Sequence, residues 1–237
     1  MKVLLLCIAM LLIIGIGDHD IHDYEVEEKI ESQNYGAVKG QIVLPKKSLR
    51  KVVRKRRSRG YSRSVLSRAN RAKKFNEYEK SMIYLIPLDQ KNYYQREDIN
   101  ILSQKDVSFN PAHVVIQKNQ SLNILNRDNI FHNVFSNSDV KRFNIGKVRQ
   151  NVDRMITFES VGHIQVFCDI HAFMSSIITI VDSPYYTTAS EDGTFEIRNV
   201  PPGKYRVVGW HSKAEFDPAL IEVRGGRFTN VKKLVFN

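Results

Sequence analysis

One short stretch of the 237-residue chain carries three side chains that bind soft metal ions. In "FCDIHAFMSSIITIV", residues 167–181, Cys168, His171 and Met174 follow one another at steps of three residues. The apolar runs on either side are typical of strands, so the three residues fall on the loop between them. Thiolate, imidazole and thioether together favour copper, and His₂Cys with a long axial Met is the ligand set of blue-copper electron-transfer sites.

Such a site needs a second histidine from the end of another strand. His132, in "NRDNIFHNVFS", follows the apolar run "LNILN" after a polar turn and stands 36 residues before Cys168. That separation leaves room for about two strands and their connections. His113, inside an alternating strand, and His163, beside a turn glycine, are expected to be surface or structural histidines.

The elements that must position these ligands are short β-strands. The apolar runs are rich in Val, Ile, Phe and Tyr and are separated by Gly, Pro, Asn and Asp, which is typical of strands and turns. No long stretch after the N-terminus shows apolar residues at helical spacing, so we predict an all-β fold of one or two sandwiches. The strand-like runs are "GQIVLP", "SMIYLIPL", "HVVIQ", "LNILN", "HIQVF", "SIITIV", "GTFEIRNV" and "KYRVVGW".

Two segments, "FNPAHVVIQKNQSLNILNRDNIFHNVFSNS" and "FESVGHIQVFCDIHAFMSSIITIVD", resemble the cupredoxins, the small blue-copper proteins. The family pattern runs Asn-x-Asp, then His-Asn-Val, then Gly, Cys, His and Met. The Cys-x-x-His-x-x-Met loop is most similar to that of amicyanin, and plastocyanin-like proteins share the pattern. The resemblance covers residues 105 to 182 and implies a Greek-key β-sandwich with one type 1 copper near one end. Its implied ligands are His132, Cys168, His171 and Met174.

The same resemblance assigns roles around the metal. Asn133 matches the asparagine that ties the two ligand-bearing loops together. His171 is implied to reach the surface, ringed by Ala172, Phe173 and Pro184, where an apolar patch would dock a redox partner protein.

A second resemblance concerns the flanking sequence. "GAVKGQIVLP", "MIYLIPL" and "GTFEIRNVPPGKYRVVGW" resemble the carboxypeptidase regulatory-like domain, a transthyretin-like β-sandwich. We therefore expect a discontinuous domain, residues 36–90 and 184–237, around a cupredoxin domain at 101–183. An alternative gives residues 81–89 to the cupredoxin as its first strand. The whole order resembles bacterial exported proteins labelled plastocyanin-like or methylamine-utilisation-like.

The N-terminus predicts export. Lys2 is followed by an apolar run, Val3 to Ile16, and small residues near Gly17, which is the layout of a secretory signal peptide at 1–17. The run is short for a membrane span, although an uncleaved anchor is the rival interpretation. Cleavage would leave an acidic leader at 18–35, no transmembrane segment, and Cys168 as the one thiol. We expect a periplasmic or extracellular protein.

The positive charge of the chain is concentrated in one segment. Residues 46–74 hold fourteen Lys or Arg and no Asp or Glu, whereas the rest has 22 Lys or Arg against 25 Asp or Glu. Such a block favours a solvated inserted loop, which serves either solubility alone or contact with an acidic redox partner or an anionic surface. Motifs for nucleic-acid binding are missing from the sequence, so no nucleic-acid partner is expected.

These patterns predict a one-electron transfer protein with a single copper ion, not an enzyme. A type 1 site leaves no position for substrate, and the sequence has no His-x-His cluster, HExxH motif or Gly-rich phosphate loop. Two alternatives stay open: a copper carrier or sensor, and a surface interaction module in which copper is ancillary.

Overall fold

In the residues that it describes, the structure, a computed structural model, has β-strands as almost its only regular secondary structure. These residues are 34–45, 62–65, 67, 77–89, 94–214 and 216–235. The predicted all-β class is confirmed. The expected signal peptide (1–17), almost all of the acidic leader (18–35) and most of the basic segment (46–74) lie outside the described residues. No helix within the described ranges is long and apolar enough to cross a membrane.

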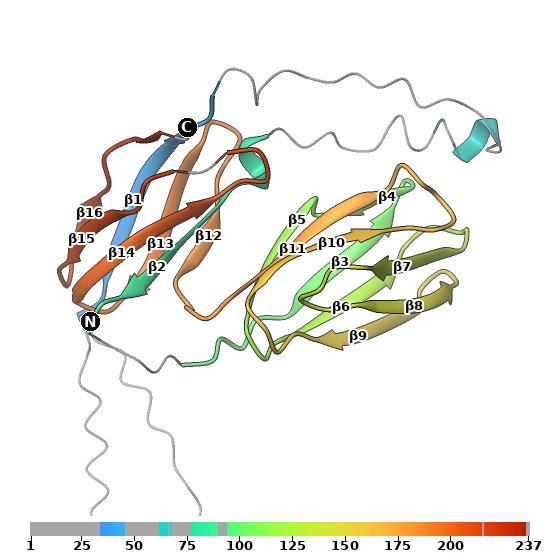
Figure 1. Ribbon diagram of the computed structural model, residues 1–237, viewed down its shortest axis with the longest axis horizontal. Helices are drawn as coiled ribbons and strands as arrows, with labels where there is room; N and C mark the ends of the chain where they lie inside the picture. Colours follow the sequence, from blue (N-terminus) through green and yellow to red (C-terminus); the bar gives the residue numbers. More distant parts are fainter. Residues whose placement is uncertain are drawn as a thin grey trace, which may run out of the picture. The chain divides into compact units, whose positions relative to one another are not determined.

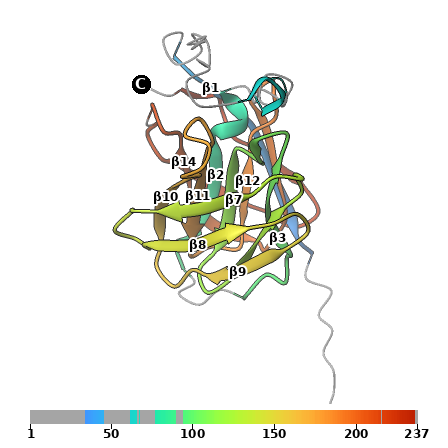
Figure 2. The ribbon, with the colours of Figure 1, turned by 90° about the vertical axis from the view of Figure 1, so that its right-hand side faces the viewer.

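Nine strands from the middle of the chain form two sheets, which we call the central sandwich (Figure 1). One sheet has the order β5-β11-β10-β7-β8 and the other β4-β3-β6-β9. Figure 2 shows β8 beside β7 at the edge of the first sheet. The strands are β3 (Asn100–Lys105), β4 (Ser108–Asn110), β5 (His113–Gln117), β6 (Ser121–Asn126), β7 (His132–Ser136), β8 (Phe143–Val148), β9 (Asp153–Thr157), β10 (Gly162–Phe167) and β11 (Ser175–Val181).

Apolar alternation explains why these segments form strands around a common core. Along β6, Leu122 and Ile124 are buried while their neighbours are half-buried, as expected for a strand with one face turned inward. β5 is buried at every position and lies parallel to β11, which fits the continuous apolar runs of buried parallel strands. The core between the sheets includes Leu102, Phe109, Val134, Val166 and Ile178.

Eight strands from the two ends of the chain form two further sheets, which we call the terminal sandwich. Their orders are β13-β1-β16, with β17 also paired to β1, and β12-β2-β14-β15. β1 lies antiparallel to β13 and parallel to β16 and β17, so segments from opposite ends of the chain are side by side (Figure 1). The strands are β1 (Gly36–Val43), β2 (Met82–Pro87), β12 (Tyr186–Thr188), β13 (Thr194–Val200), β14 (Gly203–Trp210), β15 (Ala219–Val223), β16 (Phe228–Asn230) and β17 (Leu234–Val235).

The terminal core is apolar, and its pairing decides one alternative from the sequence. Val38, Leu85 and Val207, from three different strands, are fully buried in it. β2 pairs with β12 and β14, so the alternative that placed residues 81–89 in the cupredoxin sheet is wrong. The transthyretin-like assignment and the boundaries 36–90, 101–183 and 184–237 stay predictions.

Candidate metal centre

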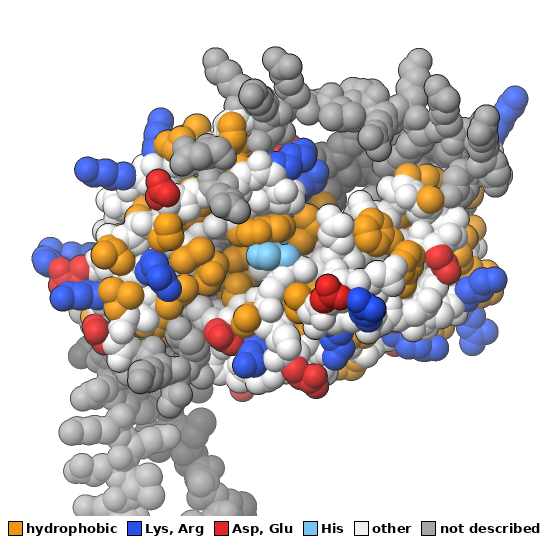
Figure 3. Space-filling view, viewed as in Figure 1, with side chains coloured by type: hydrophobic (Ala, Val, Ile, Leu, Met, Phe, Trp, Pro, Cys, Tyr) orange, Lys and Arg blue, Asp and Glu red, His pale blue; other side chains and the backbone are white. Residues whose placement is uncertain are grey.

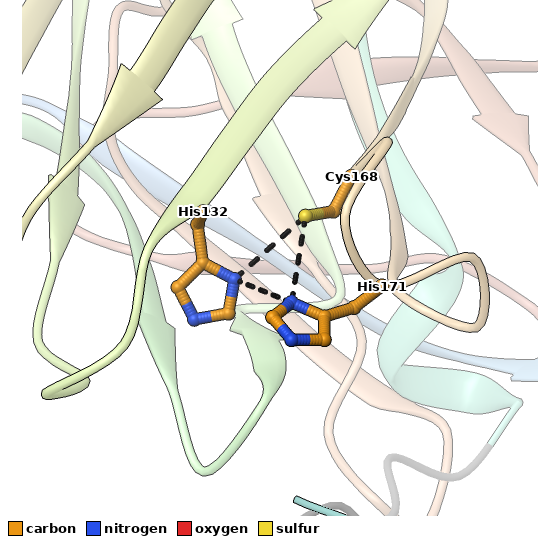
Figure 4. Close-up of side chains that lie close together, drawn as sticks. All are labelled: His132, Cys168 and His171. Carbon is orange, nitrogen blue, oxygen red and sulfur yellow. Dashed lines mark hydrogen bonds between the residues drawn. The ribbon is translucent and has the colours of Figure 1, made fainter. Parts of the chain in front are cut away.

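Three of the four predicted ligands meet at one end of the central sandwich (Figure 4). The sulfur of Cys168 lies 3.7 Å from Nδ1 of His132 and 3.8 Å from Nδ1 of His171. The two Nδ1 atoms are 3.2 Å apart. All three side chains are buried, and their donor atoms point toward one another.

The spacing of the three donor atoms fits a metal ion. The three donor atoms form a triangle with sides of 3.7, 3.8 and 3.2 Å, and the point in its plane equidistant from all three lies about 2.1 Å from each. For comparison, bonds from Zn²⁺ to His nitrogen and Cys sulfur are ~2.0–2.3 Å long. One thiolate and two imidazoles are soft to borderline donors, which suits copper better than Mg²⁺ or Ca²⁺. The cluster is therefore a possible copper site.

Strand pairing brings the ligands together from distant parts of the chain. β7 and β10 are antiparallel neighbours, with Phe135 opposite Phe167. If this register is continued, His132 at the start of β7 stands opposite Ile170, between Cys168 and His171. Those two ligands lie on the short loop between β10 and β11. The sequence prediction of a strand-end loop facing a histidine from another strand is thus realised in the geometry.

Met174 is the last residue of the same loop, directly before β11. Its backbone N–H donates to the carbonyl of His171 at 2.9 Å, and its side chain is 2% exposed. The side chain belongs to the same core cluster as Cys168. The thioether is therefore buried near the end of the sandwich that holds the ligands, and its axial role stays a prediction.

The surroundings of Cys168 favour the thiolate that a metal requires. Burial alone would raise the pKa of the thiol, but the imidazole rings of His132 and His171, each within 3.8 Å of the sulfur, and the backbone N–H of Asn133 lower it from 9.0 to about 6. The thiolate is the form that binds metals. One of the three candidate ligands is therefore favoured in its metal-binding form.

Sequence analysis missed one residue of this centre, Asp128. Its Oδ2 accepts a hydrogen bond from Nε2 of His132 at 2.9 Å, on the side of the ring away from Cys168. Burial lowers the pKa of His132, but the hydrogen bonds with Asp128 and Cys168 outweigh it and raise this pKa above its usual value. The position of Asp128 in the Asn-x-Asp pattern was a signal, but its partner could not be read from spacing.

Asn133, expected to tie the ligand loops, makes a contact across them. Its Nδ2 donates to Oδ2 of Asp169 at 2.9 Å. Because Asp169 follows Cys168 directly, this bond joins the start of β7 to the β10–β11 loop. The backbone N–H of Asn133 also contributes to lowering the pKa of Cys168.

Only some of the residues predicted to form the docking surface are exposed beside His171. Ala172 is exposed and Phe173 is half-buried, but the ring of His171 is only 4% exposed, against 0% for His132. The expectation that Pro184 joins this surface is wrong. Pro184 follows the far end of β11, a seven-residue strand that spans about 20 Å, and its carbonyl accepts from Arg96.

The two histidines excluded from the site lie elsewhere, as expected. His113 is buried, with Nδ1 at 2.9 Å from the carbonyl of Lys80 and Nε2 at 2.8 Å from Oγ1 of Thr179. Since a carbonyl only accepts, Nδ1 carries the proton and Nε2 accepts from the hydroxyl. His163 is exposed and contacts the same hydroxyl through Nδ1 at 3.0 Å. Both roles are structural.

An apolar pocket of about 340 Å³ lies apart from the three ligands, none of which lines it. His163 and Trp210 both line this pocket, and their rings stack with centroids 4.0 Å apart. Tyr84, Ile86 and Val208 add apolar walls. Figure 3 shows apolar side chains gathered over the terminal sandwich, with Lys, Arg, Asp and Glu spread among them. Among the described residues on this face, no patch of one charge sign stands out.

Comparison with known families gives one match to part of the chain. A family model described as polysaccharide lyase family 4, domain II, matches residues 179–231, which run from the end of β11 through β16. This is less than half of the chain. No curated protein sequence matched the chain.

Solved structures similar to the chain include copper proteins. Amicyanin from Paracoccus versutus is 16% identical, with a TM-score of 0.33, over 41% of this chain and 98% of that one. A purple cupredoxin from Nitrosopumilus maritimus is 16% identical, with a TM-score of 0.32, over 35% and 99%. A copper-containing nitrite reductase from Thermus scotoductus is 20% identical, with a TM-score of 0.34, over 40% of this chain and only 25% of that one. At these TM-scores the likeness carries no functional conclusion, and the copper site rests on its own geometry.

Proposed function

We propose that the chain is an exported copper protein that transfers single electrons through one type 1 site. The observation that carries this proposal is the buried triangle of His132, Cys168 and His171 donor atoms, whose size suits one metal ion. In this proposal Met174 is the axial ligand, and the bound copper supplies a one-electron couple.

The surroundings of the ligands suit electron transfer better than catalysis. Asp128 holds His132 on the side of the ring away from the metal, and the backbone N–H groups of Asn133 and His171 donate to Cys168, so these ligands keep their places whichever oxidation state is bound. Their burial excludes water and leaves no evident position for a substrate. We therefore propose that the protein is not an enzyme.

Electrons would enter or leave near the β10–β11 loop. Ala172 and Phe173 lie beside His171 in this loop, and the Phe173 ring centroid is 6.2 Å from that of His171. A redox partner protein with an acidic face, steered by the basic segment 46–74, would dock there transiently. This steering predicts association that weakens as salt is raised.

Spectroscopy of the copper-loaded protein tests the proposal. Oxidised protein should show an intense visible Cys-to-copper charge-transfer band, which Cys168→Ser abolishes. Met174→Leu should keep the band but raise the reduction potential, since loss of a weak axial donor disfavours Cu(II). Met155→Leu, at a 70% exposed position of β9, is the matched control and should change neither.

Two outcomes would decide against this function. A wild-type protein that stays colourless with Cu(II) under oxidising conditions overturns the type 1 site. A coloured protein that cannot be reduced and reoxidised reversibly favours the alternative role of a copper carrier.

A further inference from the structure

The carboxylate of Asp128 is the most completely hydrogen-bonded charged group near the candidate metal centre. Oδ1 accepts from the backbone N–H of Asp106 at 2.8 Å, and Oδ2 accepts from the backbone N–H of Val107 at 2.9 Å. Oδ2 also accepts from Nε2 of His132 at 2.9 Å. Asp128 is 6% exposed, so this carboxylate faces three donors and almost no solvent.

The turn that supplies two of these donors has an unfavourable backbone. Asp106 and Val107, between β3 and β4, have φ angles of 52° and 55°. A β-branched residue with positive φ is a genuine outlier, and such conformations persist only where their surroundings over-determine them. Here the Val107 side chain is fully buried in the central core, and both N–H groups converge on Asp128.

A second set of hydrogen bonds holds the backbone of the β6–β7 loop in which Asp128 lies. The backbone N–H of Asp128 donates to Oδ1 of Asn126 at 2.8 Å. Nδ2 of Asn126, itself 0% exposed, donates to the carbonyls of Ile130 and Val148. The loop from β6 to β7 is therefore braced at both ends, and the carboxylate has little freedom to turn away from His132.

We propose that Asp128 is a positioning residue that fixes the orientation and tautomer of His132 before metal arrives and favours Cu(II) over Cu(I). The inference rests on the proposed copper function. A carboxylate that accepts from Nε2 keeps the proton there, which leaves Nδ1, the atom facing Cys168, unprotonated for the metal. A buried negative charge behind the ligand also stabilises the more highly charged ion.

The first test uses the metal-free wild-type protein and needs no variant. Long-range ¹H–¹⁵N NMR correlations, recorded well above the ordinary imidazole pKa, should show His132 protonated on Nε2 and not on Nδ1. A ring protonated on Nδ1, or a mixture of tautomers like that of an exposed histidine, overturns the inference whether or not copper binds.

The second test compares Asp128→Asn with Asp139→Asn, which removes the same charge from a side chain that is 91% exposed. Asp128→Asn should weaken Cu(II) binding about 10- to 100-fold, the usual effect of losing a hydrogen-bond partner of a metal ligand. Cu(I) binding should change less, by about tenfold relative to Cu(II), which raises the one-electron potential by about 59 mV. Asp139→Asn should leave both unchanged.

The outcomes separate this inference from the copper function itself. If wild type binds Cu(II) with its charge-transfer band and Asp128→Asn leaves affinity and potential unchanged, the positioning role is wrong and the copper function stands. If wild type has no band, the copper function is wrong, and the tautomer in the metal-free protein still decides whether Asp128 sets the ring. Should Asp128→Asn fail to fold, that same NMR measurement decides.

Discussion

The two sandwiches are built from the same kind of strand but differ in what they bury. Of the fifteen buried polar or charged residues within the described ranges, twelve lie between Gln104 and Thr179, in the central sandwich. The terminal sandwich has an apolar core of similar size and few buried polar side chains. A buried polar group lowers stability unless it is hydrogen-bonded, and the candidate metal centre accounts for part of this concentration, through Asn126, Asp128, His132, Asn133 and His171.

The difference also separates stability from function. The terminal core is held by apolar packing. The end of the central sandwich near Cys168 is also held by hydrogen bonds, which Asp128 makes with Asn126 and His132, Asn126 with Val148, and Asn133 with Asp169. A substitution in the terminal core should change the free energy of unfolding, whereas a substitution in the hydrogen-bonded end of the central sandwich should mainly change metal binding. Three predictions sharpen this contrast.

The largest expected effect on stability comes from the terminal core. Leu85→Ala removes a fully buried side chain from β2 and should lower the free energy of unfolding by about 2–5 kcal/mol. Leu220→Ala, at a 73% exposed position of β15, is the matched control and should cost within about 0.5 kcal/mol. Denaturant titration measures both. The copper spectrum should be the same in the two variants, and an altered band in Leu85→Ala would refute the separation of roles.

The next effect concerns a buried polar group of the central sandwich that is not a ligand. Burial lowers the pKa of His113 from 6.5 to about 4, so the unfolded chain takes up a proton at a higher pH than the folded one. Stability from this residue is complete above pH 6.5 and is lost as the pH falls toward 4. The gap of about 2.5 pH units corresponds to about 3 kcal/mol.

His113→Gln should flatten this part of the pH dependence of unfolding, measured by denaturant titration between pH 7 and 4. His163→Gln, at an exposed position, should keep most of it. An unchanged slope in His113→Gln would show that other groups carry the acid sensitivity.

The smallest effect is expected at the loop tie. Asn133→Ala removes the hydrogen bond to Asp169, which is solvent-exposed, and should cost about 1 kcal/mol. The β10–β11 loop should then exchange its amide hydrogens faster, while copper still binds. Asn123→Ala breaks a comparable bond to Asp153 at 3.0 Å and is the control. Equal loop exchange in both variants would contradict a special role for Asn133.

The strands and the three-ligand cluster could be predicted because their signals are local. Alternating or continuous apolar runs gave β5, β6, β10, β11, β13 and β14, and steps of three residues put Cys168, His171 and Met174 on one loop. His132 could be predicted as a ligand because a His₂Cys copper site requires a second imidazole from the end of another strand. Strands with weak apolar patterns, such as β8 and β9, were missed because their side chains are largely exposed.

The support behind the ligands could not be predicted, because it depends on backbone that contradicts local preference. The residue types at Asp106 and Val107 do not predict two consecutive positive φ angles, because valine is among the residues least suited to a positive φ. The two-residue hairpin loop between β3 and β4 requires this shape, and the carboxylate of Asp128, more than twenty residues later, and the core around Val107 stabilise it. Pro184 was misplaced for a similar reason, since the direction of the chain after β11 is a tertiary property.

The parallel pairing of β1 with β16 and β17 has a mechanical consequence. A force that draws Gly36 and Val235 apart pulls β1 and β17 in opposite directions along their length, so their hydrogen bonds are loaded in shear and must break together. The tension passes directly between these strands. The candidate ligands His132, Cys168 and His171 lie on strands and loops inserted between β2 and β12, so they stay unstretched until the hydrogen bonds between β1 and its parallel partners break.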